Sequence, residues 1–112
     1  MKVRLTWVLA LSVCAPIQAA DREDLTPSQA QGKQLYYRAC LPCHAPGLWG
    51  SNRLARRMDQ KSAVLESRTD LTVAAIRTVV RAGLGSMPPY RRTEVSDADV
   101  DAIVAYLTRA AR

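Results

Sequence analysis

Three side chains that can do chemistry stand together near the middle of the chain. The stretch YYRACLPCHAPG, residues 36–47, holds Cys40 and Cys43, and the single histidine of the sequence, His44, follows at once. Two thiols and an imidazole in this order suit three kinds of chemistry: a redox-active disulfide, a zinc site, or the covalent attachment of a haem. The elements that surround the motif must decide among them.

The first two alternatives find little support in the rest of the sequence. A redox-active CxxC motif belongs to a strand–helix unit within a sheet, and no segment shows the alternating pattern that predicts a strand. A structural zinc site needs four ligands. Apart from Cys40, Cys43 and His44, the predicted mature chain offers no other cysteine or histidine.

The haem interpretation uses all three side chains. In a CxxCH motif each thiol forms a thioether with a vinyl group of the haem, and the adjacent histidine is the proximal ligand of the iron. The composition agrees, because a short chain with no phenylalanine has little with which to build a core. We therefore predict one haem c, bound through Cys40 and Cys43, with His44 as an iron ligand.

The second axial ligand is predicted to be Met87. No second histidine exists, and Met1 lies in the segment that we expect to be removed. Met58 stands in a helix-permissive run and is better explained as a core residue. Met87 lies in the loop LGSMPPYRRTE, where two prolines stiffen the backbone behind it. Ligation by His44 and Met87 would fill both axial positions, which favours electron transfer over catalysis and raises the reduction potential.

The first twenty residues are predicted to be a secretory signal peptide. Lys2 and Arg4 precede the apolar run LTWVLALSV, and small residues follow at Ala19 and Ala20. The run is too short to span a bilayer, so no membrane span is expected in the mature protein. Cys14 follows Val13 rather than a small residue, which argues against lipid anchoring. Residues 21–112 then form one exported domain in the periplasm.

The domain is predicted to be all-α. Thr26, Pro27 and Gln29 form a helix start, and that helix should run to about Ala39. Residues 45–52 are expected to be a loop, and residues 53–68 a short helix with irregular chain. Residues 71–82 have an amphipathic pattern that ends at Gly83. The last helix should begin after Ser96, with apolar residues at helical spacing thereafter.

The charge predicts an acidic partner rather than nucleic acid. The chain has 16 basic and 10 acidic residues, a net charge of +6. Loss of Lys2 and Arg4 with the signal peptide would leave about +4. No basic run alternates with aromatic residues as a nucleic-acid groove requires.

Residues 26–109 resemble a class I c-type cytochrome with one haem. The resemblance rests on GKQLYYRACLPCH, VVRAGLGSMPPY and DVDAIVAYL. It implies a small cytochrome c fold, with three to four helices around the covalently bound haem, in which Gly32 and Tyr36 of the first helix pack against Tyr106 of the last. The sequence departs from the family after the histidine, where Gly-Pro often supplies a carbonyl that orients the imidazole. Which carbonyl orients His44 therefore stays open.

The resemblance implies an electron carrier that serves redox partner proteins, and not an enzyme. The loop RAGLGSMPPY is also similar to that of the cytochrome subunit of p-cresol methylhydroxylase-type flavocytochromes, where electrons come from a flavoprotein subunit. Arg91 and Arg92 follow the Met87 loop and are the favoured docking charges for a partner. A second basic run lies at Arg53, Arg56, Arg57 and Lys61.

Overall fold

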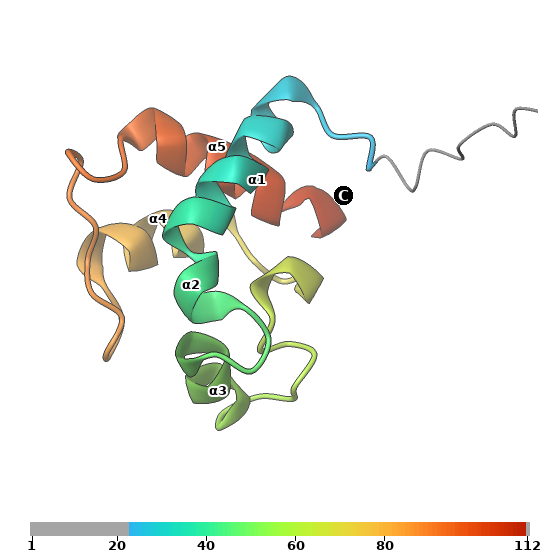
Figure 1. Cartoon of the computed structure of the whole chain (residues 1–112), viewed down its shortest axis with the longest axis vertical. Helices are drawn as coiled ribbons and strands as arrows, with labels where there is room; N and C mark the ends of the chain where they lie inside the picture. The colour runs from blue at the N-terminus through green and yellow to red at the C-terminus, as the bar shows by residue number, and fades with distance from the viewer. Residues whose placement is uncertain (1–22, 112) are drawn as a thin grey trace, which may run out of the picture.

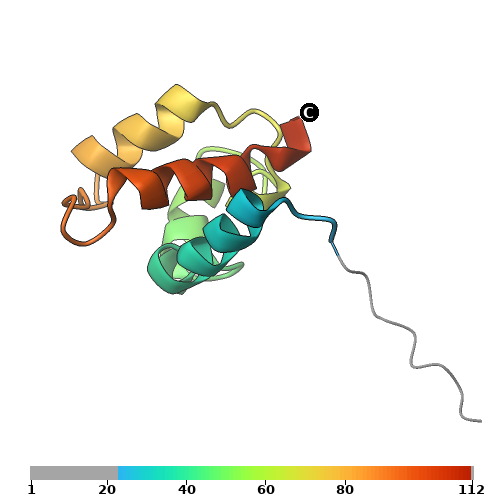
Figure 2. The same ribbon diagram turned by 90° about the horizontal axis from the view of Figure 1, so that it is seen from above.

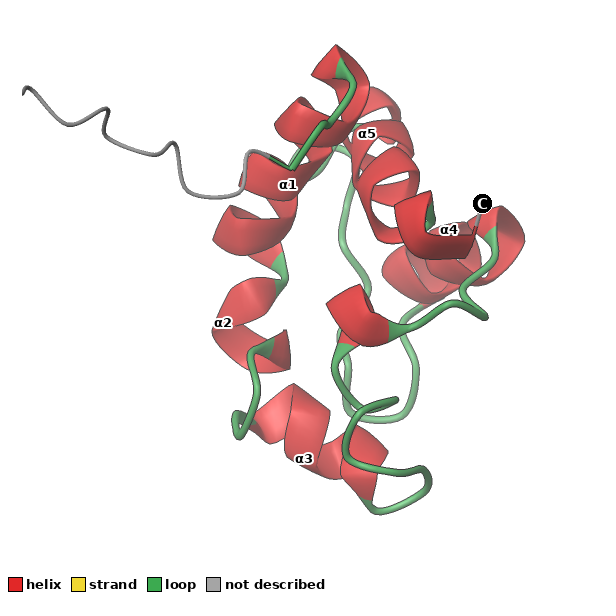
Figure 3. Cartoon of the chain, turned by 90° about the vertical axis from the view of Figure 1, so that its right-hand side faces the viewer, coloured by secondary structure: helices red, strands yellow, loops and turns green. Residues whose placement is uncertain are grey.

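The computed structural model describes residues 23–111, and the regular structure among them is helical (Figures 1 and 3). The α-helices are α1 (Pro27–Ala39), α2 (Leu41–His44), α3 (Trp49–Ala55), α4 (Val73–Ala82) and α5 (Asp97–Leu107). Two short 3-10 turns lie at Leu65–Ser67 and Arg109–Ala111. The described residues contain one isolated bridge, between Leu84 and Met87, and no strand. The predicted all-α class is confirmed, and the predicted signal peptide lies outside the described residues.

The two longest helices begin with reciprocal caps, as the sequence predicts for α1. The Thr26 hydroxyl accepts a bond from the backbone N–H of Gln29, and the Gln29 side chain accepts one from the Thr26 N–H. Ser96 and Asp99 form the same arrangement at the start of α5. Such caps satisfy N–H groups that have no partner within the helix, so they fix where α1 and α5 begin.

The α1–α5 crossing is the most extensive helix–helix contact of the fold, and Figure 2 shows α5 lying between α1 and α4. Gly32 makes it possible, because a Cβ atom there would collide with the carbonyl group of Ala102. The close approach stacks Tyr36 beside Tyr106, with ring centroids 5.8 Å apart and both side chains essentially buried. This is the packing that the family resemblance implies for these three residues.

A partly buried polar contact ties the middle of the chain to this crossing. The Tyr106 hydroxyl donates a hydrogen bond to Glu66 in the 3-10 turn. The guanidinium of Arg109 lies 4.0 Å from the Tyr106 ring centroid and also binds Glu23 at 2.7 Å. Burial, together with the Glu66 carboxylate, raises the pKa of Tyr106. The phenol therefore stays protonated and keeps donating across the physiological pH range.

Helix α4 follows its predicted pattern, and α3 does not. Thr72 caps α4, and Gly83 ends it with a positive φ of 74°. Helix α3 begins at Trp49, inside the segment predicted to be a loop, and it ends at Ala55. Residues 56–64 form turns rather than the expected continuation. No helix among residues 23–111 has the length and apolar character needed to cross a membrane.

Substitution of Gly32 by alanine tests the α1–α5 crossing. Alanine is the better helix former by about 1 kcal/mol, so the substitution would stabilise α1 if the site had room. We expect it instead to lower the free energy of unfolding by about 1–3 kcal/mol, because the two backbones must separate. Thermal or urea unfolding of the holoprotein measures the change.

Gln34→Ala, at an exposed position of the same helix, is the matched control and should change stability by less than about 0.5 kcal/mol. A Gly32→Ala protein as stable as the parent would mean that the backbones are not in contact at this position.

Candidate functional site

An apolar cavity of about 380 Å³ lies between the segment from the end of α1 to α3 on one side and α4, α5 and the loop between them on the other. Its wall is built mainly from aliphatic side chains of several elements, among them Leu54, Leu65, Leu71, Ile76, Val79, Val80, Ile103 and Leu107. Cys40, Cys43, His44 and Met87 all line the same cavity. The structure thus brings together the four side chains that the sequence singles out, although 43 residues separate His44 from Met87.

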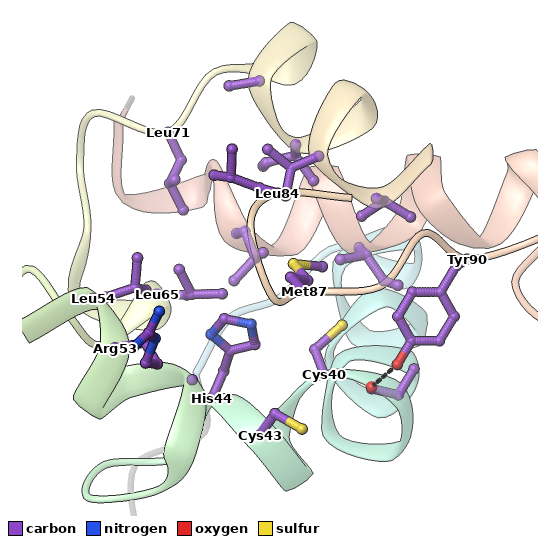
Figure 4. Close-up of a pocket in the computed structure, with 18 of the residues that line it drawn as sticks. Cys40, Cys43, His44, Arg53, Leu54, Leu65, Leu71, Leu84, Met87 and Tyr90 are labelled. Carbon is purple, nitrogen blue, oxygen red and sulfur yellow. Dashed lines mark hydrogen bonds between the residues drawn. The ribbon is translucent and has the colours of Figure 1, made fainter. Parts of the chain in front are cut away.

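The CxxCH motif is itself helical, which the sequence analysis did not anticipate. Cys40 closes α1 and opens α2, and its carbonyl accepts bonds from the backbone N–H groups of Cys43 and His44. One helical turn therefore presents both thiols and the imidazole from one short element. In Figure 4 the imidazole of His44 rises from α2 toward Met87, and the Cys40 sulfur lies beside them.

Gly50 and Ser51, which the sequence analysis missed, hold the segment after His44. A Cβ atom at Gly50 would lie 2.8 Å from the carbonyl oxygen of Cys43 and 3.2 Å from Cε1 of His44, so only glycine lets α3 approach the ring. The buried Ser51 hydroxyl lies 2.7 Å from the carbonyl oxygen of His44 and 2.8 Å from that of Ala45. The sequence signal for these two residues is a small residue followed by serine shortly after the CxxCH motif.

Burial sets the protonation of the motif. It lowers the pKa of His44, so the imidazole is neutral at neutral pH and keeps a lone pair for a metal ion. The Nδ1 atom of His44 is buried and has no hydrogen-bond partner among the described residues. No backbone carbonyl of the described chain therefore accepts a hydrogen bond from this atom.

The thiol of Cys40 does not suit redox exchange. Burial, with a smaller contribution from Cys43, raises the pKa of Cys40 to about 11. A redox-active CxxC motif needs a thiol whose pKa is lowered. Within residues 23–111 no three histidine, cysteine or carboxylate side chains converge as a metal ion held by protein ligands alone would require. The apolar cavity instead fits a large planar apolar group better than it fits a disulfide centre or a zinc ion.

The loop that carries Met87 is fixed at both ends. Met87 and Leu84 exchange backbone hydrogen bonds of 3.0 and 3.1 Å. A Cβ atom at Gly83 would lie 2.6 Å from the Met87 carbonyl oxygen, so the helix end and the loop are in contact. On the far side, the Tyr90 hydroxyl donates to the carbonyl of Ala39 at 2.7 Å, next to Cys40 (Figure 4). This bond joins the loop directly to the end of α1.

Met58, the alternative thioether, does not line the cavity. Its sulfur instead accepts a long hydrogen bond of 3.9 Å from Arg68. Arg68 and Arg53 do line the cavity and are the cationic groups in its wall. Arg68 is also bound to Asp70 at 2.7 Å, whereas no carboxylate within the described chain pairs with Arg53.

Comparison with known proteins places the chain in a family. The family model described as cytochrome c oxidase, cbb3-type, subunit III matches residues 27–107. A cytochrome c6 of Cyanidioschyzon merolae is 32% identical over 112 residues, which are 100% of this chain and 97% of that protein. A cytochrome c6 of Synechocystis is 32% identical over 83 residues, covering 74% and 66% of the two chains. No significant match was found among solved structures.

The matched region includes the five α-helices found among residues 23–111 and the whole cavity wall. The predicted resemblance is therefore confirmed, and so is the all-α cytochrome c fold that it implied. An iron porphyrin joined to the chain by thioethers is the group that this family carries, and it accounts for an apolar cavity that two cysteines border. The chain belongs to the monohaem class I c-type cytochromes and is an electron-transfer protein, homologous to cytochrome c6, that carries one covalent haem c.

Proposed function

We propose that Cys40 and Cys43 bind the haem c of this cytochrome, and that His44 and Met87 are its axial ligands. The observation that carries this proposal is the meeting of all four side chains at one apolar cavity. They come from two segments, the α2 turn and the loop after α4, that are far apart in the sequence. No other methionine among residues 23–111 lines that cavity.

The residues around the cavity then have distinct roles. When bound, the haem supplies a reversible one-electron couple between ferric and ferrous iron. His44 offers a neutral imidazole, because its burial disfavours the protonated form. Met87 offers a thioether, which stabilises ferrous iron and raises the reduction potential. With both positions taken, the protein has no open iron site for oxygen or peroxide.

The two arginines in the cavity wall suit the polar edge of the haem. Arg53 and Arg68 are placed to pair with its two carboxylates, which an apolar cavity could not otherwise accept. The aliphatic residues exclude water from the iron, and a drier surrounding keeps the ferrous state favourable. The electron would enter and leave where the cavity meets solvent.

We further propose that the protein works outside the cytoplasm as a soluble carrier. A signal peptide at residues 1–20 would export it, leaving residues 21–112 as the mature cytochrome in the periplasm. Haem attaches to reduced thiols, whereas the periplasm is an oxidising compartment. The two requirements are compatible, because a sulfur that has formed a thioether cannot be oxidised to a disulfide. The full-length match to a protein named cytochrome c6 supports a carrier over a flavoprotein subunit.

Removal of both motif cysteines tests the attachment. In Cys40→Ala/Cys43→Ala we expect the yield of folded holoprotein to fall by at least about tenfold, because the cavity then lacks its anchored core and the remaining apolar core is small. Helical circular dichroism and haem absorbance of the purified protein measure the loss. Cys14→Ala is the control and should leave the yield unchanged. Equal yields for the two variants would contradict the assignment.

Substitution of the two methionines tests the axial ligand. Met87→Ala should abolish the near-infrared sulfur-to-iron charge-transfer band of the oxidised protein, lower the reduction potential and allow the ferrous protein to bind carbon monoxide. Met58→Ala should retain the band and should not bind carbon monoxide, because its sulfur lies outside the cavity wall. The reverse pattern would assign the ligand to Met58.

Fractionation of the native host tests location and assembly together. We expect osmotic shock to release the cytochrome, and size-exclusion chromatography to show it eluting alone, with a polypeptide mass below the 12.3 kDa of the full chain. Co-elution with a yellow flavoprotein would instead support the flavocytochrome subunit. Retention of the cytochrome in the cytoplasmic fraction would contradict export.

A further inference from the structure

The surface arginines divide into those with an acidic partner and those without. Arg77 binds Asp101 at 2.7 Å, and Arg81 binds Asp97 at 2.7 Å. Both pairs join α4 to α5 on the face away from the cavity. Each guanidinium there is offset by a carboxylate, so this face presents little net positive charge to a partner.

The two arginines that the sequence favoured for docking are paired as well. Arg91 lies 3.5 Å from Glu94, and Arg92 lies 2.8 Å from Asp97. Glu94 also accepts the backbone N–H of Arg91, so the pair closes a turn. Asp97 also binds Arg81, so three arginines share two carboxylates and leave a local charge of about +1 beside this loop. The electrostatic case for docking at Arg91 and Arg92 is therefore weaker than their exposure alone suggests.

The second basic run remains unpaired. We call it the α3 cluster, and its members are Arg53, Arg56, Arg57 and Lys61, all of them exposed. None forms an ion pair with an acidic residue of the described chain. Asp59, which lies within the run, directs both carboxylate oxygens to Ser62. Arg53 is the member proposed above to pair with a haem carboxylate, so Arg56, Arg57 and Lys61 against Asp59 leave a local charge of about +2.

The α3 cluster adjoins the mouth of the cavity. Trp49 begins α3 and is 53% exposed, and Leu48 before it is 42% exposed. Trp49 and Arg53 line the cavity, as does Leu84 from the Met87 loop, which is 63% exposed. Exposed apolar side chains thus stand at the opening, with unpaired positive charge beside them. An apolar centre with a charged border is the usual composition of a protein–protein contact.

We propose that the α3 cluster is the docking surface for the acidic face of a protein redox partner. This inference rests on the proposed function, because it places the partner against the exposed opening of the haem cavity. The positive field steers an acidic protein toward α3. Trp49 and Leu84 then meet the apolar part of the partner at the point where the electron crosses. A lipid surface would receive no electron there, which is why a protein is the occupant that we favour.

A pair of charge reversals tests the proposal. Arg56→Glu/Arg57→Glu changes the cluster without touching the cavity wall, since neither residue lines it. Arg91→Glu/Arg92→Glu is the matched control, with the same change in net charge. The probe is reduced flavodoxin, a small acidic flavoprotein, and the measurement is the second-order rate at which it reduces the ferric cytochrome. Haem absorbance and thermal unfolding verify that both variants fold.

We expect the α3 variant to react at least about tenfold more slowly at low salt, and the control to change by less than about twofold. The difference in rate between the two variants should become smaller as ionic strength rises from about 0.01 to 0.15 M, because the Debye length falls from about 30 to 8 Å. Equal slowing of both variants would mean that only net charge matters, and that result overturns the proposal. Greater slowing in the control would move the docking surface to Arg91 and Arg92.

Two further measurements separate the remaining outcomes. If the α3 variant keeps its rate with flavodoxin but loses binding to phosphatidylglycerol vesicles that the parent binds, the cluster serves a membrane and the protein-docking proposal fails. Dithionite reduction of the parent tests the proposed function alone. If dithionite leaves the haem spectrum unchanged, both the proposed function and the docking proposal fail. If dithionite reduces the parent normally but flavodoxin reduces both variants at equal rates, only the docking proposal fails.

Discussion

The contact between the backbones of α1 and α5 at Gly32 and Ala102 is the constraint on which the other features depend. Only a glycine permits this approach, and it brings Tyr36 and Tyr106 into their buried stack. The same crossing sets the direction of α1, whose last turn delivers the CxxCH motif to the cavity. It also places Ile103 and Leu107 of α5 on the opposite wall. A small domain with few aromatic residues thus uses one tight crossing to orient its site.

Single polar contacts then fix the segments that the helices leave free. The Tyr90 hydroxyl joins the Met87 loop to the carbonyl of Ala39, and Ser51 holds the carbonyl of His44. Ala39 directly precedes Cys40, and the carbonyl that Ser51 holds belongs to His44 itself, so both contacts act at or beside a proposed haem-binding residue. Loops tied at such points can present a ligand with little conformational freedom, which a site of fixed geometry requires. The unpartnered Nδ1 of His44 is the exception, and it leaves the ring held by packing against Gly50 rather than by a hydrogen bond.

Features that depend on residues close together in the sequence were predictable. Features that depend on contacts between residues far apart in the sequence were not. The caps at Thr26 and Ser96, the end of α4 at Gly83 and the spacing of the CxxCH motif are local, and the sequence analysis anticipated them. Helix α3 has poor intrinsic propensity in WGSN and forms because Gly50 and Ser51 pack on the motif. The pairing of Arg77 with Asp101 spans 24 residues, and no local pattern reveals it. The pairs Arg91–Glu94 and Arg92–Asp97 lie only three and five residues apart, so their partial neutralisation could have been anticipated from the sequence.

Digestion of the purified cytochrome with trypsin, followed by mass spectrometry, tests the assignment of the site most directly. Cleavage after Arg38 and Arg53 releases residues 39–53, which contain Cys40, Cys43 and His44. We predict that this peptide carries the mass of one haem and that neither thiol reacts with iodoacetamide, even after denaturation. Recovery of the same peptide without haem, and with both cysteines alkylated, would contradict the covalent site described above.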